Sequence, residues 1–189
     1  MEKTEYVLIA GQGADIFAEE HKLEIVDPDY FFTPATLEKL RHAQATESNA
    51  QSSKLGTVGA VALDKAGNLA AGTSTGGRIN KHYNRIGDSA LIGAGTYANN
   101  NTCAVSSTGH GEVFIRNVVA YDIAALIEYT KLSIEEATNL VIKTKLADGS
   151  GGVIALDKDG NYAMPYNTEG MLRGYINSDG YSETYIYEE

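Results

Sequence analysis

The chain has 189 residues, 43% of them hydrophobic, and its 15 Lys and Arg against 25 Asp and Glu give a formal net charge of −10. This length and apolar content fit one globular domain, and the acidic balance disfavours a nucleic acid or an anionic membrane as partner, because like charges repel. No apolar run is long enough to span a membrane and the start is not that of a signal peptide, so we expect a cytoplasmic protein, unless an upstream leader has been lost.

The first part of the chain predicts a strand, two helices and a linker. YVLIA (residues 6–10) is an apolar run closed by Gly11, and the following ADIFAEEH has helical spacing. Thr33 suits the N-cap, and Pro34 the first turn, of a helix over PATLEKLRHAQ. ATESNAQSSK (45–54) has no apolar face, which predicts a linker.

Two hairpins and two helices are predicted next. TVGAVALD and NLAAGTST flank a Lys65-Ala66-Gly67 turn, and ALIGAGTYA and TCAVSSTG flank Asn99-Asn100-Asn101. The single cysteine, Cys103, lies in the last of these runs, where a buried thiol is the ordinary finding. EVFIRNVVAYDIAALIEYT has helical spacing, and Ser133 with Glu136 forms a capping box for SIEEATNLVIKTKL. The chain ends in four strand-like runs, GVIALD, NYAMPYN, GMLRGYI and ETYIYE.

An internal repeat adds to the fold prediction. GAVALDKAGNLA (59–70) and GVIALDKDGNYA (152–163) share most of their residues at a constant offset, which predicts two similar hairpins in facing or adjacent sheets. VGAVAL and GVIAL are apolar almost throughout, so we expect those strands to be covered on both faces. Short strands with long helices between pairs predict an α+β fold, specifically a four-layer αββα sandwich.

Candidate chemistry lies between residues 56 and 111. The four histidines are scattered without ligand spacing, so no metal site is predicted. Glycines and hydroxyls instead recur at Gly56-Thr57, Thr75, Thr108-Gly109 and Gly111, with Arg85 three residues before Asp88. Each feature alone is typical of a turn or a surface ion pair, and their joint occurrence indicates a site. An Arg and an Asp together match the carboxylate and the ammonium of an α-amino acid.

The motifs resemble a known family. GTVGAVALDKAGNLAAGTSTGG, NRIGDSALIGAGTYANN, VSSTGHGEVFIRNVVAYDIAALIEY and MPYNTEGMLRGY are similar to the plant-type L-asparaginases, or isoaspartyl peptidases, of the N-terminal nucleophile hydrolase superfamily. The resemblance implies that superfamily's fold and a precursor that cuts itself between Gly56 and Thr57. Residues 1–56 would be the end of the α-subunit region with its linker, and residues 57–189 the β-subunit region, together one structural domain.

The resemblance also implies a role for each residue of the set. Thr57 would be the nucleophile, with its freed amine as the base. Thr75 would orient the Thr57 hydroxyl, and the Thr108 hydroxyl and the Gly109 N–H would form an oxyanion hole. The substrate would be bound by Arg85 at its α-carboxylate and Asp88 at its α-amine, helped by Gly109 and Gly111. The implied reaction is hydrolysis of the side-chain amide of L-asparagine and of β-aspartyl peptides, releasing L-aspartate.

The sequence departs from the family pattern at its start. The family's α subunit begins with a longer segment holding core strands, a cation-binding loop and an asparagine that assists at the oxyanion, so we expect an N-terminally truncated fold with no cofactor and no metal. One hypothesis is a hydrolase acting on a small molecule, assembled as a homo-oligomer or αβ heterodimer, with a separate chain supplying the missing segment. The alternative is a truncated, catalytically silent relative that serves as a binding or assembly subunit. Neither hypothesis involves nucleic acid or a membrane.

Overall fold

The computed structural model describes residues 3–45 and 56–187, and its internal contacts divide the chain into two units, residues 1–51 and 52–189. Each unit is described by itself. Most of the predicted linker lies outside the described residues. The boundary between residues 56 and 57, and the union of both regions in one domain, stay predictions.

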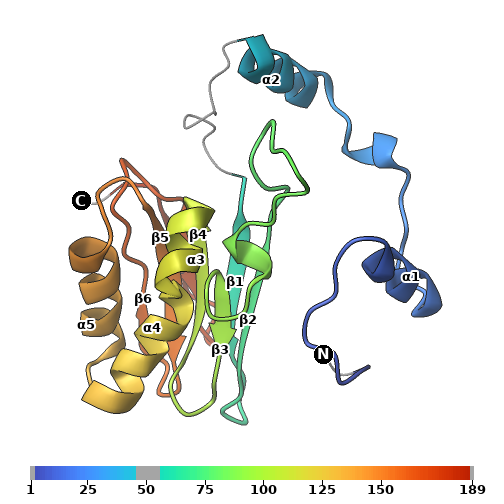
Figure 1. Ribbon diagram of the computed structural model, residues 1–189. Coiled ribbons are helices and arrows are strands. Elements are labelled where there is room, and N and C mark those ends of the chain that lie inside the picture. Colours follow the sequence, from blue (N-terminus) through green and yellow to red (C-terminus); the bar gives the residue numbers. More distant parts are fainter. Residues whose placement is uncertain (1–2, 46–55, 188–189) are drawn as a thin grey trace. The chain divides into compact units, whose positions relative to one another are not determined.

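The first unit holds two helices and almost no core. Its elements are α1 (Gln12–Glu20), η1 (Pro28–Phe31) and α2 (Pro34–Ala45) (Figure 1). α2 begins at the predicted residue, where Thr33 Oγ1 accepts the N–H of Thr36 at 3.1 Å. Residues 6–10 are exposed and pair with no strand among the described residues, so the strand prediction there is wrong. An apolar run becomes a strand only where a neighbour pairs with its N–H and C=O groups.

The second unit contains three antiparallel sheets. The first is the hairpin of β1 and β2, in which Val58 lies opposite Ser74. The central sheet has the order β3-β4-β5-β6, and β7 and β8 form the last hairpin. The strands are β1 (Val58–Leu63), β2 (Leu69–Ser74), β3 (Thr96–Ala98), β4 (Cys103–Gly109), β5 (Gly151–Asp157), β6 (Tyr162–Ala163), β7 (Arg173–Ile176) and β8 (Ser182–Tyr185).

Apart from the short η2 (Asp88–Ala90), the helices of the second unit lie between β4 and β5 in the sequence. They are α3 (Gly111–Asn117), α4 (Val119–Ala125) with a wider turn η3 (Leu126–Thr130), and α5 (Ile134–Asn139) with η4 (Leu140–Lys145). The helix predicted for EVFIRNVVAYDIAALIEYT is broken at Val118, whose left-handed φ of 50° separates α3 from α4. The capping box of α5 is confirmed, since Ser133 Oγ accepts the N–H of Glu136 and the Glu136 carboxylate accepts the N–H of Ser133.

The core lies between these helices and the central sheet. Figure 1 shows α3, α4 and α5 on one side of the central sheet and the β1–β2 hairpin on the other. Phe114, Ile123 and Ile142 are fully buried there, together with Val105 of β4. Cys103 is also fully buried, as predicted, and burial raises the pKa of its thiol to about 12. The α+β class is confirmed, and helices, central sheet and hairpin form three successive layers of the predicted four-layer αββα sandwich.

The internal repeat folds as two similar hairpins that pack together. The Asp64 carboxylate accepts the N–H groups of Ala66 and Asn68, both at 2.8 Å. In the second copy Asp157 accepts the N–H groups two and four residues further on, both at 2.9 Å. β1 and β5 are in contact across the two sheets, which confirms the prediction of facing hairpins.

The prediction that both repeats are covered on two faces holds for β5 only. Most of β5 is buried, whereas β1 contacts β4 on one side and has only half-buried and exposed residues. Gly59 points inward, where a β-carbon would lie 2.0 Å from Ser106 Oγ, and its neighbour Val58 is 67% exposed. The other outward residues of β1 are Ala60 and Ala62, whose small apolar area costs little to leave in water.

Candidate active site

Two hydroxyl groups meet where the β1–β2 hairpin opens. Thr57 precedes β1 and Thr75 follows β2, and the antiparallel register brings both to the same end of the hairpin. The Thr57 hydroxyl donates to Thr75 Oγ1 at 3.3 Å, and Gly77 N–H donates to the same oxygen at 3.1 Å. Thr75 is therefore held by the following loop while it accepts from Thr57.

The end of β4 lies at the same end of the unit. Figure 1 shows that β1 begins where β4 ends, and the two strands are held together by the packing of Gly59 on Ser106. Thr73 Oγ1 and Ser106 Oγ are hydrogen-bonded at 2.6 Å, which ties β2 to β4 as well. Thr108, two residues beyond Ser106, is thus carried toward the Thr57 end of the hairpin.

Gly109 ends β4 in a conformation that only glycine suits. Its φ is +153°, and a β-carbon at this position would lie 2.2 Å from the carbonyl oxygen of Ser150 and 2.6 Å from the Phe114 ring. The absence of a side chain lets the backbone of β4 turn directly into α3 beside the start of β5. The predicted oxyanion pair thus lies at a strand end that packs on the core.

Arg85, Asp88 and Gly111 form a second contact group. A β-carbon on Gly111, the first residue of α3, would lie 2.7 Å from Arg85 Nη2 and 2.9 Å from Asp88 Oδ1. Asp88 begins η2 (Asp88–Ala90) and is only 6% exposed. Its Oδ2 has no hydrogen-bond partner among the described residues, and burial raises the pKa of this carboxyl. The buried oxygen is thus an acceptor that a ligand's donor would satisfy.

Glu112 is a member of this group that the sequence did not reveal. Arg85 donates to its carboxylate twice, from Nε at 2.7 Å and from Nη2 at 2.9 Å, while Arg78 Nη1 lies 3.7 Å from Oε2. Hydrogen bonding to Arg85 lowers the pKa of Glu112 to about 2 and raises the pKa of Arg85. Glu112 follows Gly111 directly, but its partner Arg85 lies 27 positions earlier, and no sequence motif indicates a pairing over that distance.

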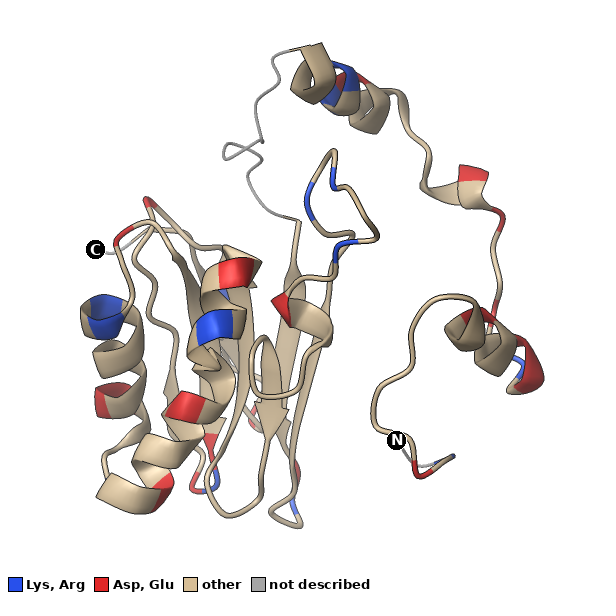
Figure 2. Ribbon diagram, in the orientation of Figure 1, with Lys and Arg blue, Asp and Glu red and all other residues tan. Residues whose placement is uncertain are grey.

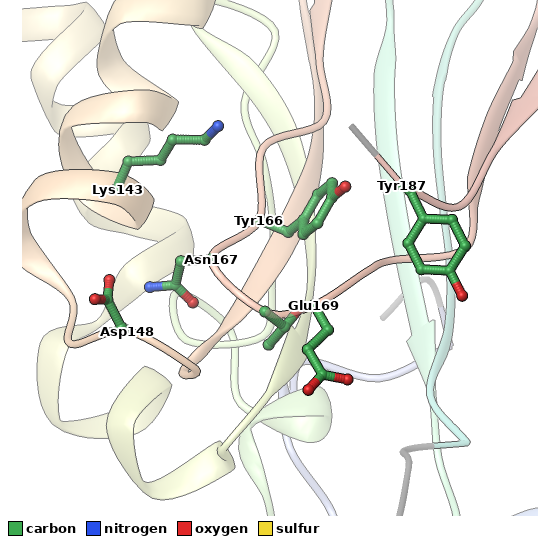
Figure 3. Close-up of a pocket in the computed structure, with 7 residues that line it drawn as sticks. Lys143, Asp148, Tyr166, Asn167, Glu169 and Tyr187 are labelled. Atoms are coloured by element: carbon green, nitrogen blue, oxygen red, sulfur yellow. The ribbon is translucent and has the colours of Figure 1, made fainter. Parts of the chain in front are cut away.

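A pocket of about 460 Å³ lies elsewhere in the second unit (Figure 3). None of the predicted site residues lines it; its walls are Lys143, Asp148, Tyr166, Asn167, Thr168, Glu169 and Tyr187. Asn167 is engaged in the fold, since its amide donates to the carbonyls of Ile142 and Ala147 and accepts the N–H of Gly151 at 2.9 Å. The chemistry-bearing residues and this pocket are therefore separate features.

Residues 3–45 and 56–187 contain no group of three or more His, Cys, Asp or Glu side chains placed to hold a metal ion. They also contain no helix that is long and apolar enough to cross a membrane.

Comparison with known proteins gives consistent matches. The model of a family described as asparaginase matches residues 1–186. An isoaspartyl peptidase of Salmonella typhimurium is 50% identical over 200 residues, which cover 100% of this chain and 64% of that protein. An isoaspartyl peptidase of Escherichia coli is 48% identical, with 100% and 62% covered. A plant-type L-asparaginase of Pyrobaculum calidifontis is 39% identical over 187 residues, with 93% and 61% covered.

The chain thus spans less than two thirds of the length of these three relatives. The family match nonetheless extends over both units, including every residue of the predicted site. This confirms the resemblance inferred from the motifs, and the chain belongs to the asparaginase family.

Proposed function

We propose that this chain carries the nucleophile of a hydrolase that cuts the side-chain amide of L-asparagine and of β-aspartyl peptides, after cutting itself between Gly56 and Thr57. The observation that carries the proposal is the hydrogen bond from Thr57 to Thr75 at the end of the sheets where β4 also ends. The names of the relatives, isoaspartyl peptidase and plant-type L-asparaginase, support the same substrates.

The first step is a shift of the backbone onto the Thr57 side chain. The hydroxyl oxygen attacks the Gly56 carbonyl carbon, the C–N bond breaks, and the hydroxyl proton ends on the released nitrogen. This leaves an ester between Gly56 and Thr57, which water opens to a Gly56 carboxylate and a free Thr57 amine. Thr75 accepts from the hydroxyl in the uncut chain, which orients the oxygen. Gly56 is exposed and water can reach the ester.

Self-cleavage creates the base for the second reaction. An α-amine has a pKa of about 7.7 to 8.0, so near neutral pH part of it is unprotonated and accepts the proton of the Thr57 hydroxyl. The oxygen attacks the side-chain carbonyl of the substrate, the amide C–N bond breaks, and the leaving nitrogen takes that proton. Water then opens the aspartyl ester and releases aspartate. Thr108 and Gly109 stabilise the anionic oxygen, where one donor is worth roughly 2.7 to 4 kcal/mol.

Arg85 and Asp88 hold the two charged ends of the substrate. Asp88 offers a buried oxygen that bonds no other described residue, which suits an ammonium group. Arg85 bonds Glu112 through Nε and Nη2, and its Nη1 makes no hydrogen bond with any described residue. Glu112 therefore acts as a positioning residue that fixes the guanidinium plane and leaves the Nη1 edge for the substrate carboxylate.

Mass spectrometry of the purified full chain tests the first step. We expect two fragments that break between Gly56 and Thr57, and a Thr57→Ala variant that stays intact. Fragmentation of the Thr57→Ala chain at the same bond would exclude self-cleavage by this hydroxyl. For the second step, the cut chain should release aspartate from a β-aspartyl dipeptide, and Arg85→Ala should lower kcat/KM steeply; an unchanged value would remove Arg85 from the substrate site.

One observation favours the second candidate, a catalytically silent binding or assembly subunit: the guanidinium of Arg85 is already bonded twice to Glu112. Only uncut chain after prolonged incubation, with no aspartate released, would support it. We also propose that the chain works in an assembly, as a homo-oligomer or an αβ heterodimer. Light scattering of the purified chain, before and after cleavage, distinguishes these states from a monomer.

A further inference from the structure

The loop that follows Thr75 is strongly basic in an acidic protein. Residues 76–87, here named the basic loop, contain Arg78, Lys81 and Arg85 and no Asp or Glu, although the chain has a net charge of −10. Figure 2 shows these cationic residues gathered on the loop beside the start of β1. A local excess of positive charge next to a cleft or nucleophile attracts an anion even where the net charge is negative.

Lys81 is folded back onto the beginning of the basic loop. Its Nζ donates to the Gly76 carbonyl at 3.1 Å, and a β-carbon on Gly77 would lie 2.8 Å from Nζ. Gly77 and Asn80 both have left-handed φ angles, of 78° and 55°, which reverse the chain and return the side chain to Gly76. The ammonium group of Lys81, an exposed residue, is therefore held at the start of the basic loop beside Gly76 and Gly77.

This position places a positive charge beside Gly77, the residue whose N–H bonds Thr75. The Gly77 N–H donates to Thr75 Oγ1, which accepts the Thr57 hydroxyl. Lys81 Nζ lies against that same Gly77. Contacts thus run without a gap from the Lys81 ammonium, through Gly77 and Thr75, to Thr57.

Lys81 also differs from the other two cations of the basic loop in its partners. Arg85 bonds Glu112, and Arg78 lies within ion-pair distance of the same carboxylate. No carboxylate of the described residues forms an ion pair with Lys81, whose one hydrogen bond goes to a neutral carbonyl. An ammonium has three donors, so Lys81 retains donors for an anionic ligand.

We propose that Lys81 binds the terminal carboxylate of the leaving residue in a β-aspartyl peptide. This inference rests on the proposed function and narrows its substrate class. Arg85 and Asp88 match the two charges of the aspartyl part, which asparagine also carries. Only a peptide adds a carboxylate beyond the scissile bond, and standard bond lengths place its oxygens within about 4 Å of the scissile nitrogen. Peptides with a free terminal carboxylate are therefore preferred over asparagine.

The test compares three substrates of the cut chain: a β-aspartyl dipeptide, the same dipeptide with a terminal amide, and L-asparagine. We expect kcat/KM for the free acid to exceed kcat/KM for the amide about tenfold, because the free acid would gain a charge-assisted hydrogen bond to Lys81 that the amide lacks. The ratio should fall toward one in Lys81→Gln and shrink in high salt, because screening weakens exposed charge pairs. Lys65→Gln is the matched control, since Lys65 lies in the turn at the other end of β1 from Thr57, and the strand between them is roughly 20 Å long.

A free-acid preference that Lys81→Gln removes and Lys65→Gln retains supports the inference. Equal rates for the free acid and the amide, or a preference that survives in Lys81→Gln, would overturn it while leaving the proposed function intact. No aspartate from any of the three compounds would overturn the proposed function, and this inference with it.

Discussion

Replacing Glu112 by Gln isolates the charge that holds Arg85 in place. Gln keeps the length of the side chain and one oxygen that can accept from Arg85, so the change removes the negative charge with little change of volume. Arg85 and Arg78 would then lie together without the carboxylate between them. We expect the variant to be less stable and to bind substrate more weakly, because the guanidinium plane is no longer fixed.

The size of the stability loss follows from the pKa of Glu112. A carboxyl whose pKa is about 2 when folded and 4.5 in the unfolded chain would contribute about 3 kcal/mol to stability at neutral pH. The side chain is 44% exposed, and solvent screening reduces this to about 1 kcal/mol. Because the folded pKa is lowered, the contribution is complete above pH 4.5 and is lost as the pH falls toward 2.

Urea unfolding of the full chain at pH 7 and pH 3 measures this effect. Glu112→Gln should be about 1 kcal/mol less stable than the unmodified chain at pH 7, and the difference should narrow at pH 3. Glu24→Gln, which removes an exposed carboxylate that lies outside every helix and strand, controls for the change in net charge. Equal stability of the Glu112→Gln and unmodified chains at both pH values would refute this explanation, as would an equal loss in the Glu24→Gln control.

Three further predictions concern other parts of the same unit. Burial raises the pKa of Asp88, whose ionised form would bind the substrate ammonium. As the pH is lowered, KM should therefore begin to rise at a higher pH than it would with an exposed carboxyl, and Asp88→Asn should abolish this dependence in a pH–rate profile. Gly109→Ala should lower the free energy of unfolding by about 1–3 kcal/mol, because the methyl group meets Ser150, while Gly72→Ala, whose added carbon meets nothing within 4 Å, should not. Phe114→Ala should cost about 3–5 kcal/mol in urea unfolding, since the ring is fully buried, and a loss below 1 kcal/mol would contradict its place in the core.

Features that depend on neighbours in the sequence could be predicted from it. The capping box of Ser133, the N-cap of Thr33 and the paired turns at Asp64 and Asp157 all rest on hydrogen bonds spanning four residues or fewer. The antiparallel hairpin that brings Thr57 to Thr75 followed from a turn signal between two strand-like runs. Local chemistry therefore predicted these elements.

Features that depend on distant partners could not be predicted. Nothing near residues 6–10 shows whether a neighbouring strand will pair with them. The left-handed break at Val118 lies inside an unbroken helical pattern, at a β-branched residue that rarely adopts such a φ. The double hydrogen bond from Arg85 to Glu112 joins two segments whose approach is set by how η2 packs against α3. The roles of the site residues stay predictions until they are measured.

The buried cysteine gives the protein a built-in reporter of sheet opening. Cys103 is the only thiol in the chain, it begins β4, and it is fully buried. Thiol reagents react with the thiolate, which a pKa of about 12 nearly eliminates at neutral pH as long as the strand is closed. Cys103 would therefore react with a chromogenic disulfide only as fast as β4 separates from the residues packed on it. The reaction rate measures that opening without any introduced label.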